Sequence, residues 1–232
     1  NPKVIILTNI EYDHPDVYPN LEATMKAYQS FVKKLPHDGL LVANKDNSKI
    51  YNLLNMIRPA KFNIKTFGFS ENCDYQITSY RLLNKKAIFH LDGEEYALYV
   101  PGKFNAANAA AAIIVAKYLG LSAEKIKEGL EKFQGTKRRF EKIIQINKIA
   151  LYDDYAHHPL EIRNTLTAAK DWLGGRRIIA IFQPHTYSRT KYLLHDFAKS
   201  FGAADQVIIT KIYASAREKE DLGISGEILA KE

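Results

Sequence analysis

The sequence has little of the material from which disulfide frameworks and membrane anchors are built. Among 232 residues there is one cysteine, so neither a disulfide network nor a cysteine metal cluster can form within the chain. The longest uninterrupted apolar run, 109–116, is far shorter than a membrane-spanning helix requires. The first residues lack the basic, apolar and small segments of a signal peptide. We therefore expect a soluble protein in a reducing, cytoplasmic setting.

Two binding signatures are also absent. No segment has the form G-x-x-x-x-G-K-[ST], because Gly102-Lys103 is followed by Phe104 and lacks the upstream glycine. If the chain handles ATP, its phosphate loop lies elsewhere. The formal net charge of +7 favours nucleic acid, but the basic residues are scattered and no nucleic-acid recognition motif is present. We expect no nucleic-acid partner, and a basic balance equally suits a protein that handles nucleotide phosphates.

The composition, 46% hydrophobic and 25% charged, is typical of a globular protein. In the first part, apolar runs and helical spacing alternate. We expect strands at 4–10, 39–43 and 66–69, three short antiparallel strands at 75–83, 87–91 and 96–100, and helices at 21–35, 48–56, 105–119 and 122–133. Ser48, Asn105 and Ser122 are the expected N-terminal residues of three of these helices.

From Gly135 onward a second pattern begins. It predicts a hairpin at 143–146 and 149–152, helices at 159–173 and 192–201, and strands at 178–182 and 206–211. Apolar strands alternating with helices indicate a parallel sheet. We therefore expect an α/β protein with two domains, 1–135 and 136–232.

The most informative segment is Tyr-Asp-Asp-Tyr-Ala-His-His-Pro at 152–159, which follows a buried-looking strand at 143–151. Phe-Gln-Pro-His-Thr-Tyr-Ser-Arg at 182–189 follows the next apolar strand. Ionisable groups cost desolvation free energy unless they are paired, solvated or used. Because ligands bind at the carboxyl ends of strands in α/β sheets, both clusters are expected to form one site.

Several chemistries suit these residues. Asp153 and Asp154 can bind a pair of ribose hydroxyls or organise a cation. The cationic wall for an anionic substrate would consist of His157, His158, His185 and Arg189. A zinc site built from the histidines is an alternative, although it explains neither the flanking tyrosines nor the arginine. A lone histidine is usually structural, but three histidines after two successive strands favour a functional site.

Three other segments can each be interpreted either as part of a binding site or as having a purely structural role. His14 follows the first strand and can bind a divalent cation, or it belongs to a solvated loop. Asn105 and Asn108 share one side of a helix and can bind a nucleobase edge, unless Asn105 only caps the helix. Arg138 and Arg139 can clamp phosphate oxygens, or they form a basic linker.

Taken in order, these segments resemble the Mur ligase family, across essentially the whole chain. The matching pieces are Thr-Asn-Ile-Glu-Tyr-Asp-His (8–14), Pro-Gly-Lys-Phe-Asn-Ala-Ala-Asn-Ala-Ala (101–110), Gly-Thr-Lys-Arg-Arg-Phe (135–140), Asp-Asp-Tyr-Ala-His-His-Pro (153–159) and Phe-Gln-Pro-His-Thr-Tyr-Ser-Arg-Thr (182–190). The resemblance implies an incomplete central ATP-binding domain at 1–135, without its phosphate loop, followed by a truncated Rossmann-like ligase domain at 136–232 with a mainly parallel sheet.

The resemblance also implies a reaction. ATP and Mg²⁺ would activate the carboxylate of UDP-N-acetylmuramate as an acyl phosphate, and L-alanine would attack it to form an amide. The implied roles are metal binding by His14, adenine binding by Asn105 and Asn108, γ-phosphate binding by Arg138 or Arg139, and ribose binding by Asp154. The residues implied to face the muramoyl substrate and the amino acid are Tyr155, His157, His158, His185 and Arg189. His157 or His158 would accept the proton of the amine, and Arg139 would assist in catalysis.

Two positions depart from the family pattern, since Phe104 stands where histidine is common and Thr186 where arginine is common. The first weakens a nucleotide contact at position 104, and the second removes part of the anion-binding wall. One alternative function is a ligase that recycles murein tripeptide, which shares the Asp-Asp-aromatic-Ala-His-His-Pro motif. Another is a binding module without catalysis, which the missing phosphate loop favours.

Overall fold

The structure is a computed structural model that describes residues 2–15, 17–216, 218 and 220–232. The chain divides into two compact units. The first unit comprises residues 1–12 and 18–134, and the second comprises 13–17 and 135–232. The main division therefore falls between Gln134 and Gly135, and a short segment around His14 groups with the second unit.

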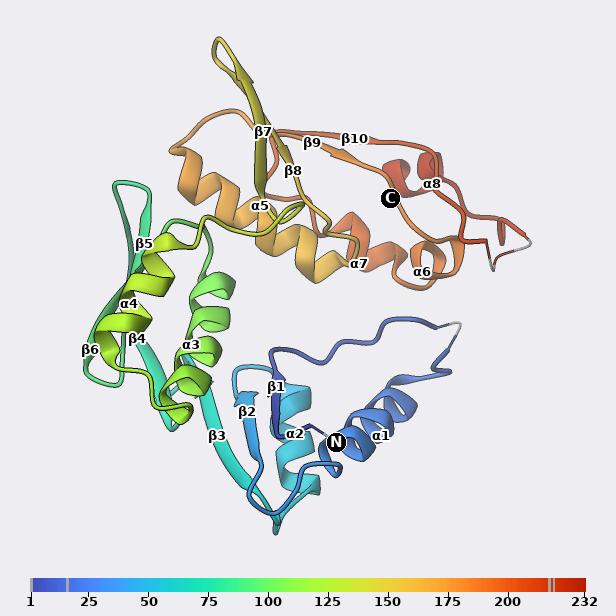
Figure 1. The fold of residues 1–232 in the computed structure, drawn as a ribbon. Coiled ribbons are helices and arrows are strands. Elements are labelled where there is room, and N and C mark those ends of the chain that lie inside the picture. Colours follow the sequence, from blue (N-terminus) through green and yellow to red (C-terminus); the bar gives the residue numbers. More distant parts are fainter. Residues whose placement is uncertain (1, 16, 217, 219) are drawn as a thin grey trace. The chain divides into compact units, whose positions relative to one another are not determined.

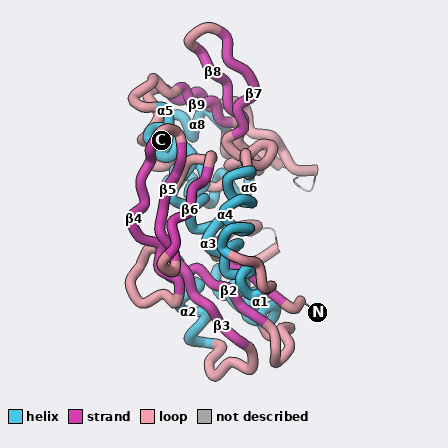
Figure 2. The backbone as a smooth tube through the Cα atoms, turned by 60° about the vertical axis from the view of Figure 1, so that its left-hand side comes forward, coloured by secondary structure: helices cyan, strands magenta, loops and turns pink. Residues whose placement is uncertain are grey.

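The first unit is built on one sheet with the strand order β1-β2-β3-β4-β5-β6 (Figures 1 and 2). Its strands are β1 (Val4–Leu7), β2 (Leu40–Asn44), β3 (Asn63–Gly68), β4 (Tyr75–Leu83), β5 (Lys86–Leu91) and β6 (Glu94–Leu98). The pairs from β1 to β4 are parallel, whereas β4, β5 and β6 form an antiparallel meander. The antiparallel region expected between residues 75 and 100 is therefore confirmed.

Four helices cover this sheet: α1 (Leu21–Val32), α2 (Ser48–Met56), α3 (Lys103–Tyr118) and α4 (Ala123–Lys132). Strand β2 shows why helices lie on both faces. Leu41 and Ala43 pack in one core with α1 and α2, while Leu40 and Val42 pack in the other core with α3. Successive side chains of a strand point to opposite faces, so a strand that is apolar at every position needs cover on both sides.

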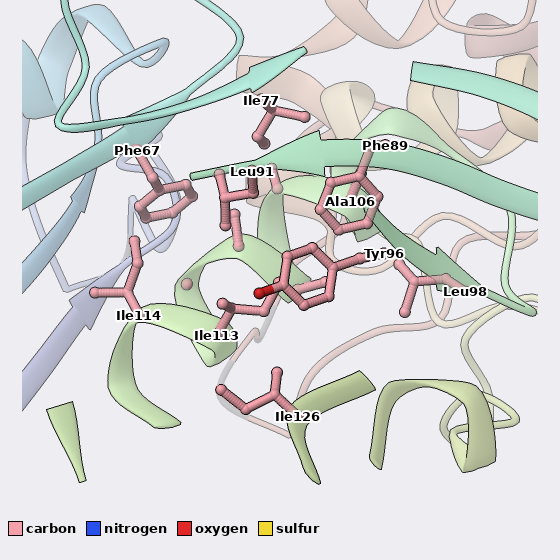
Figure 3. Packing of buried hydrophobic residues seen from close by; sticks show 14 of the residues in the cluster. Phe67, Ile77, Phe89, Leu91, Tyr96, Leu98, Ala106, Ile113, Ile114 and Ile126 are labelled. Carbon is pink, nitrogen blue, oxygen red and sulfur yellow. The ribbon is translucent and has the colours of Figure 1, made fainter. Parts of the chain in front are cut away.

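The larger core lies between α3 and the strands from β2 to β6 (Figure 3). Small alanines on α3, such as Ala106 and Ala110, are fully buried and allow the helix to approach the sheet closely. The ring of Phe89 stacks on Tyr96 with centroids 5.8 Å apart. Tyr96 is 1% exposed, and its hydroxyl oxygen finds no hydrogen-bond partner among the described residues.

Two expected helix starts are wrong. Helix α2 is capped by Asn47, whose side chain accepts hydrogen bonds from the amides of Lys49 and Ile50, so Ser48 is already inside the helix. Helix α3 begins at Lys103, and Gly102 occupies the cap position with φ of 97°. Asparagine competes well with serine for the cap, and only glycine adopts that φ without strain. Ser122 caps α4 as expected.

In its described residues, the second unit contains a hairpin, a two-stranded parallel sheet and four helices. The strands are β7 (Glu141–Ile146), β8 (Ile149–Asp153), β9 (Ile179–Phe182) and β10 (Gln206–Ile209), and the helices are α5 (Pro159–Leu173), α6 (Tyr187–Tyr192), α7 (Leu194–Ala198) and α8 (Gly226–Lys231). The parallel β9–β10 pair is the expected one, and α5 has the expected bounds. The single helix expected at 192–201 is instead two short helices, α6 and α7, which meet at Leu193.

The core of the second unit lies on one face of β9 and β10. Phe182 is its centre, with ring centroids 5.5 Å from both Phe197 and Phe201. On the opposite face Ile179 and Ile181 are 50% and 68% exposed. The described part of the second unit therefore covers one face of these strands and leaves both isoleucines largely exposed.

The hairpin expected at 143–146 and 149–152 is confirmed, since β7 and β8 pair antiparallel and turn at Asn147, but the burial expected of 143–151 is wrong. Figure 1 shows the tip of this hairpin projecting away from α5. Ile146 and Ile149, next to the turn, are 60% and 76% exposed. Apolar composition therefore did not indicate burial here, because no helix of the described part of the second unit packs against the tip of the hairpin (Figure 1).

None of the helices in the described ranges combines the length and apolar character that crossing a bilayer requires.

The buried hydroxyl of Tyr96 generates a stability prediction. Replacing Tyr96 with Phe removes an oxygen that lacks a partner, so the free energy of unfolding of the first unit should rise by about 1 kcal/mol. Urea denaturation measures this change. Tyr51→Phe is the matched control, since Tyr51 is exposed on α2 and its change should leave stability within about 0.5 kcal/mol. A loss of stability in Tyr96→Phe would contradict the structure.

Candidate functional site

The segment after β8 is held in place by Asp154. One oxygen of its carboxylate accepts a hydrogen bond from the amide of Ala156 (2.8 Å), and the other accepts from the amide of Phe140 (2.7 Å). Arg138 and Phe140 both have φ above 50°, a conformation that is uncommon for residues other than glycine. Asp154 therefore joins the turn at 138–140 to the motif at 153–159. Both of its oxygens already have backbone partners.

Tyr155 lies under the two arginines. The guanidinium carbons of Arg138 and Arg139 lie 4.7 and 5.5 Å from the centroid of its ring, and the ring of His157 meets it edge-on at 5.1 Å. Cations are attracted to the face of an aromatic ring, and arginine stacks there readily. Tyr155 thus orients both arginines while about half of its own surface remains exposed.

The environment of His157 defines its tautomer. Its Nδ1 lies 3.0 Å from the carbonyl oxygen of Tyr155, which can only accept a hydrogen bond. The neutral ring must therefore carry its proton on Nδ1 and its lone pair on Nε2. Nε2 lies 3.9 Å from the carboxylate of Asp13. The backbone amide of His157 donates to the carboxylate of Glu161, which holds the backbone that carries the ring.

His158 has a structural role that its sequence position did not suggest. It is the N-cap of α5, and its Nδ1 accepts a hydrogen bond from the amide of Leu160 (3.3 Å). Glu161 completes a capping box by accepting from the backbone amide of His158 (3.2 Å). Of the two neighbouring histidines, only His157 keeps a ring nitrogen lone pair that this local structure does not use.

Arg189 is buried, with 5% of its surface exposed. Its Nε and Nη2 donate to the two carboxylate oxygens of Asp13 at 2.8 and 3.3 Å, and its Nη1 donates to the carbonyl oxygen of His185 at 2.5 Å. Burial alone would raise the pKa of Asp13, but the hydrogen bonds from Arg189 and from the amide of His14 lower it below its usual value. In this arrangement the guanidinium is committed to Asp13 and not exposed as a wall for substrate.

His185 is exposed at the end of β9, where its ring packs on that of Tyr213 at 5.6 Å. Partial burial, followed by the nearby Arg189 and His157, holds the pKa of His185 below its usual value, while Glu218 acts in the opposite direction. The imidazole is therefore neutral at neutral pH.

These side chains surround one cavity of about 1040 Å³ in the second unit. The expected site residues that line it are His14, Arg138, Asp154, Tyr155, His157, His185 and Arg189. The two clusters after β8 and β9, which are separated by about thirty residues of sequence, thus meet at one cavity. Arg139 and His158 lie next to it in sequence but do not line it.

Asn105 and Asn108 belong to the first unit, on the first turns of α3. The side-chain amide nitrogen of Asn105 donates to the carbonyl oxygen of Pro101 at 2.7 Å. The side chain of Asn105 therefore stabilises the start of α3 from inside the helix and is not its N-cap. Asn108 is exposed. Their spacing of three places both on one side of the helix, as expected.

Comparison with known proteins identifies the family. Residues 1–116 match the Mur ligase middle domain, and residues 138–232 match the Mur ligase glutamate ligase domain. The chain belongs to the Mur ligase family. The Mur ligase fold expected from the sequence motifs is thereby confirmed.

The chain is similar to two curated Mur ligases, each named UDP-N-acetylmuramate–L-alanine ligase. The protein of Caldanaerobacter subterraneus subsp. tengcongensis is 43% identical over 96% of this chain, and that of Desulfitobacterium hafniense is 40% identical over 99%. The matches cover 48% and 51% of those proteins. The chain therefore spans about half the length of the curated relatives it matches.

Solved structures give the same family. The UDP-N-acetylmuramate–alanine ligase of Thermotoga maritima matches 99% of this chain and 48% of its own, with a TM-score of 0.74 and 29% identity. A murein peptide ligase of Psychrobacter arcticus matches 90% of this chain and 43% of its own, with a TM-score of 0.61 and 25% identity. A MurF ligase of Thermotoga maritima in complex with ADP matches 90% of this chain and 48% of its own, with a TM-score of 0.73. Because the two sequences are only 17% identical, this likeness concerns the fold alone.

Four residues at this Mur ligase site were not picked out individually by any motif. They are Asp13, Glu161, Tyr213 and Glu218. Glu161 carries a usable signal, because a capping box places an acidic residue three positions after the cap. The others act through contacts over 28 to 176 residues of sequence, which no local pattern reveals.

The two hydrogen bonds to Asp154 generate a prediction. In Asp154→Asn one carboxylate oxygen becomes an NH₂ group, which cannot accept from a backbone amide. The free energy of unfolding of the second unit should fall by about 2 kcal/mol, the size of a charge-assisted hydrogen bond. Urea denaturation and amide exchange at Phe140 measure this loss.

Asp153→Asn is the matched control for that measurement. Asp153 forms only a half-exposed pair with Arg138 at 3.4 Å, so its loss should cost less than about 1 kcal/mol. Equal destabilisation by the two variants would show that Asp154 does not hold the turn.

Proposed function

We propose that this chain forms part of an ATP-dependent ligase that joins L-alanine to UDP-N-acetylmuramate. The observation that carries the proposal is the similarity, at 43% and 40% identity over nearly the whole chain, to two proteins named for that activity. The cavity of the second unit adds support, because it gathers the motif residues that such a reaction requires. As cosubstrate, ATP would convert the muramoyl carboxylate to an acyl phosphate and supply the driving force.

His157 is the residue we assign to proton transfer. The amine of alanine must lose a proton when it attacks the activated carboxyl group. With its Nδ1 proton directed at the carbonyl oxygen of Tyr155, His157 presents the lone pair of Nε2 as the acceptor. His158 was the other candidate, but its Nδ1 serves α5, and we therefore favour His157.

Positioning and charge neutralisation are assigned to the cations and aromatic rings of the second unit. Arg138 and Arg139, oriented by Tyr155, would bind oxygens of the transferred phosphoryl group. Tyr155 and His185 would face the muramoyl substrate and the amino acid. Asp154, which was expected at the ribose, would act mainly by holding the turn that carries Arg138. Arg189 would hold the backbone of His185 by donating a hydrogen bond to the carbonyl oxygen of His185.

The first unit would contribute to nucleotide binding. Asn108, exposed on α3, and Asn105 beside it can donate to and accept from the edge of adenine. His14 is assigned to Mg²⁺, but the described residues include no group of three or more His, Cys, Asp and Glu side chains arranged to hold an ion. His14 accounts for one ligand at most, and the residues present do not form a magnesium site by themselves. No step is assigned to the metal.

The ligase activity is tested on the full-length protein. With ATP, Mg²⁺ and UDP-N-acetylmuramate, ADP release should depend on L-alanine, and mass spectrometry should detect the alanyl product. Replacing L-alanine with a murein tripeptide tests the recycling activity, and tripeptide-dependent ADP release without an alanine-dependent one would overturn the proposal. The 232-residue chain alone should release no phosphate, because its sequence contains no phosphate loop.

The role of His157 makes a kinetic prediction. In the full-length protein, His157→Gln should lower kcat by about 100-fold, the usual contribution of a general base, and change the KM for ATP by less than about twofold. Steady-state kinetics with each substrate varied in turn measures both quantities. His90→Gln is the control, since His90 lies on β5 and pairs with Glu95. A decrease of kcat below about threefold would remove His157 from proton transfer.

A further inference from the structure

The carboxylate of Glu218, which lies outside the five motif segments, accepts hydrogen bonds from the start of α6. One oxygen of Glu218 accepts hydrogen bonds from the amide of Ser188 (2.8 Å) and from its hydroxyl (2.6 Å). The other oxygen accepts from the amides of Tyr187 (3.0 Å) and Ser215 (3.4 Å). Four donors thus converge on one side chain, and the three on Tyr187 and Ser188 lie about thirty residues away in the sequence.

These hydrogen bonds favour the ionised carboxylate. Partial burial would raise the pKa of Glu218, but the hydrogen bonds from Ser188, Tyr187 and Ser215 outweigh it and lower the pKa below its usual value. Hydrogen bonds to a charged acceptor are stronger than neutral ones. The ionised carboxylate of Glu218 is therefore held against the start of α6.

The same segment fixes the residues just before α6. The amide of Tyr213 donates to the carbonyl oxygen of Pro184 (2.8 Å), and the amide of Thr210 donates to that of Phe182 (2.9 Å). The ring of Tyr213 packs on His185. His185 therefore lies between two attachment points, Tyr213 on its N-terminal side and Glu218 on its C-terminal side.

From this geometry we propose that Glu218 is a positioning residue, which holds the turn before α6 so that His185 faces the cavity in one orientation. The proposal builds on the proposed ligase function, in which His185 faces the muramoyl substrate and the amino acid. Glu218 would act through the backbone amides of Tyr187 and Ser188 and through the hydroxyl of Ser188, without contacting either substrate.

Glu218→Gln tests whether the hydrogen bonds of Glu218 hold the start of α6, without any assay of activity. In the glutamine variant one oxygen keeps its donors, while the NH₂ group opposes the other two. NMR of the 232-residue chain should show amide exchange at Tyr187 and Ser188 about tenfold faster, equivalent to roughly one lost hydrogen bond.

The pKa of His185 gives a second readout in the same spectra. The groups that act on it are Arg189 from α6, His157 from the segment after β8, and Glu218, of which only Glu218 raises the pKa. Removing the negative charge should therefore lower the pKa of His185 further. Glu220→Gln, an exposed position two residues away, removes the same charge but none of the hydrogen bonds of Glu218 and should leave amide exchange at Tyr187 and Ser188 unchanged.

Kinetics of the full-length protein tests the functional consequence. Glu218→Gln should raise the KM for UDP-N-acetylmuramate or L-alanine by about fivefold to tenfold, while the KM for ATP changes less than about twofold. Glu218→Asp, which keeps the charge but is one methylene shorter, should show the same pattern. Equal changes for all three substrates, or none, would overturn the positioning role.

The two arms separate the possible failures. If the full-length protein has no ligase activity, the proposed function fails, while the NMR measurements still decide whether Glu218 holds the turn. If amide exchange and the pKa of His185 match the wild type in Glu218→Gln, the positioning role fails even in an active ligase.

Discussion

The candidate site depends on the two hydrogen bonds that Asp154 accepts from the amides of Phe140 and Ala156. The turn that contains Arg138 has positive φ at non-glycine residues, a conformation that persists only when the surroundings impose it. Without Asp154 the backbone carrying the arginines would be free to relax away from Tyr155. The stacking of both guanidinium groups on that ring therefore follows from a carboxylate that itself faces the backbone.

The same use of carboxylates recurs through the second unit. Glu161 accepts from the amides of His157 and His158, and Glu218 accepts from those at the start of α6. Each negative charge is balanced by backbone N–H groups and orients a neighbouring histidine or arginine. The acidic side chains of the second unit thus hold the backbone that carries the histidines and arginines of the candidate site.

Much of this was predictable from local sequence. The bounds of α5, the parallel β9–β10 pair and the meeting of the two motifs at one cavity follow from periodicity and from the position of strand ends. Helix caps were predicted less well, because Asn47 and Gly102 compete with neighbours that look equally suitable. The contacts of Arg189 with Asp13 and of His185 with Tyr213 were not predictable, since these partners come from distant parts of the sequence.

The exposed side of β9 has a consequence for the behaviour of the chain in solution. Ile179 and Ile181 place two large apolar side chains next to each other on one face of β9. Within the described residues β9 pairs with β10 alone, so its other edge is unpaired. Open apolar faces with unpaired edges promote association between molecules, and each isoleucine withdrawn from water stabilises such a contact by roughly 1 kcal/mol. This face therefore favours self-association of the isolated chain, which the mutual repulsion of molecules with a net charge of +7 opposes.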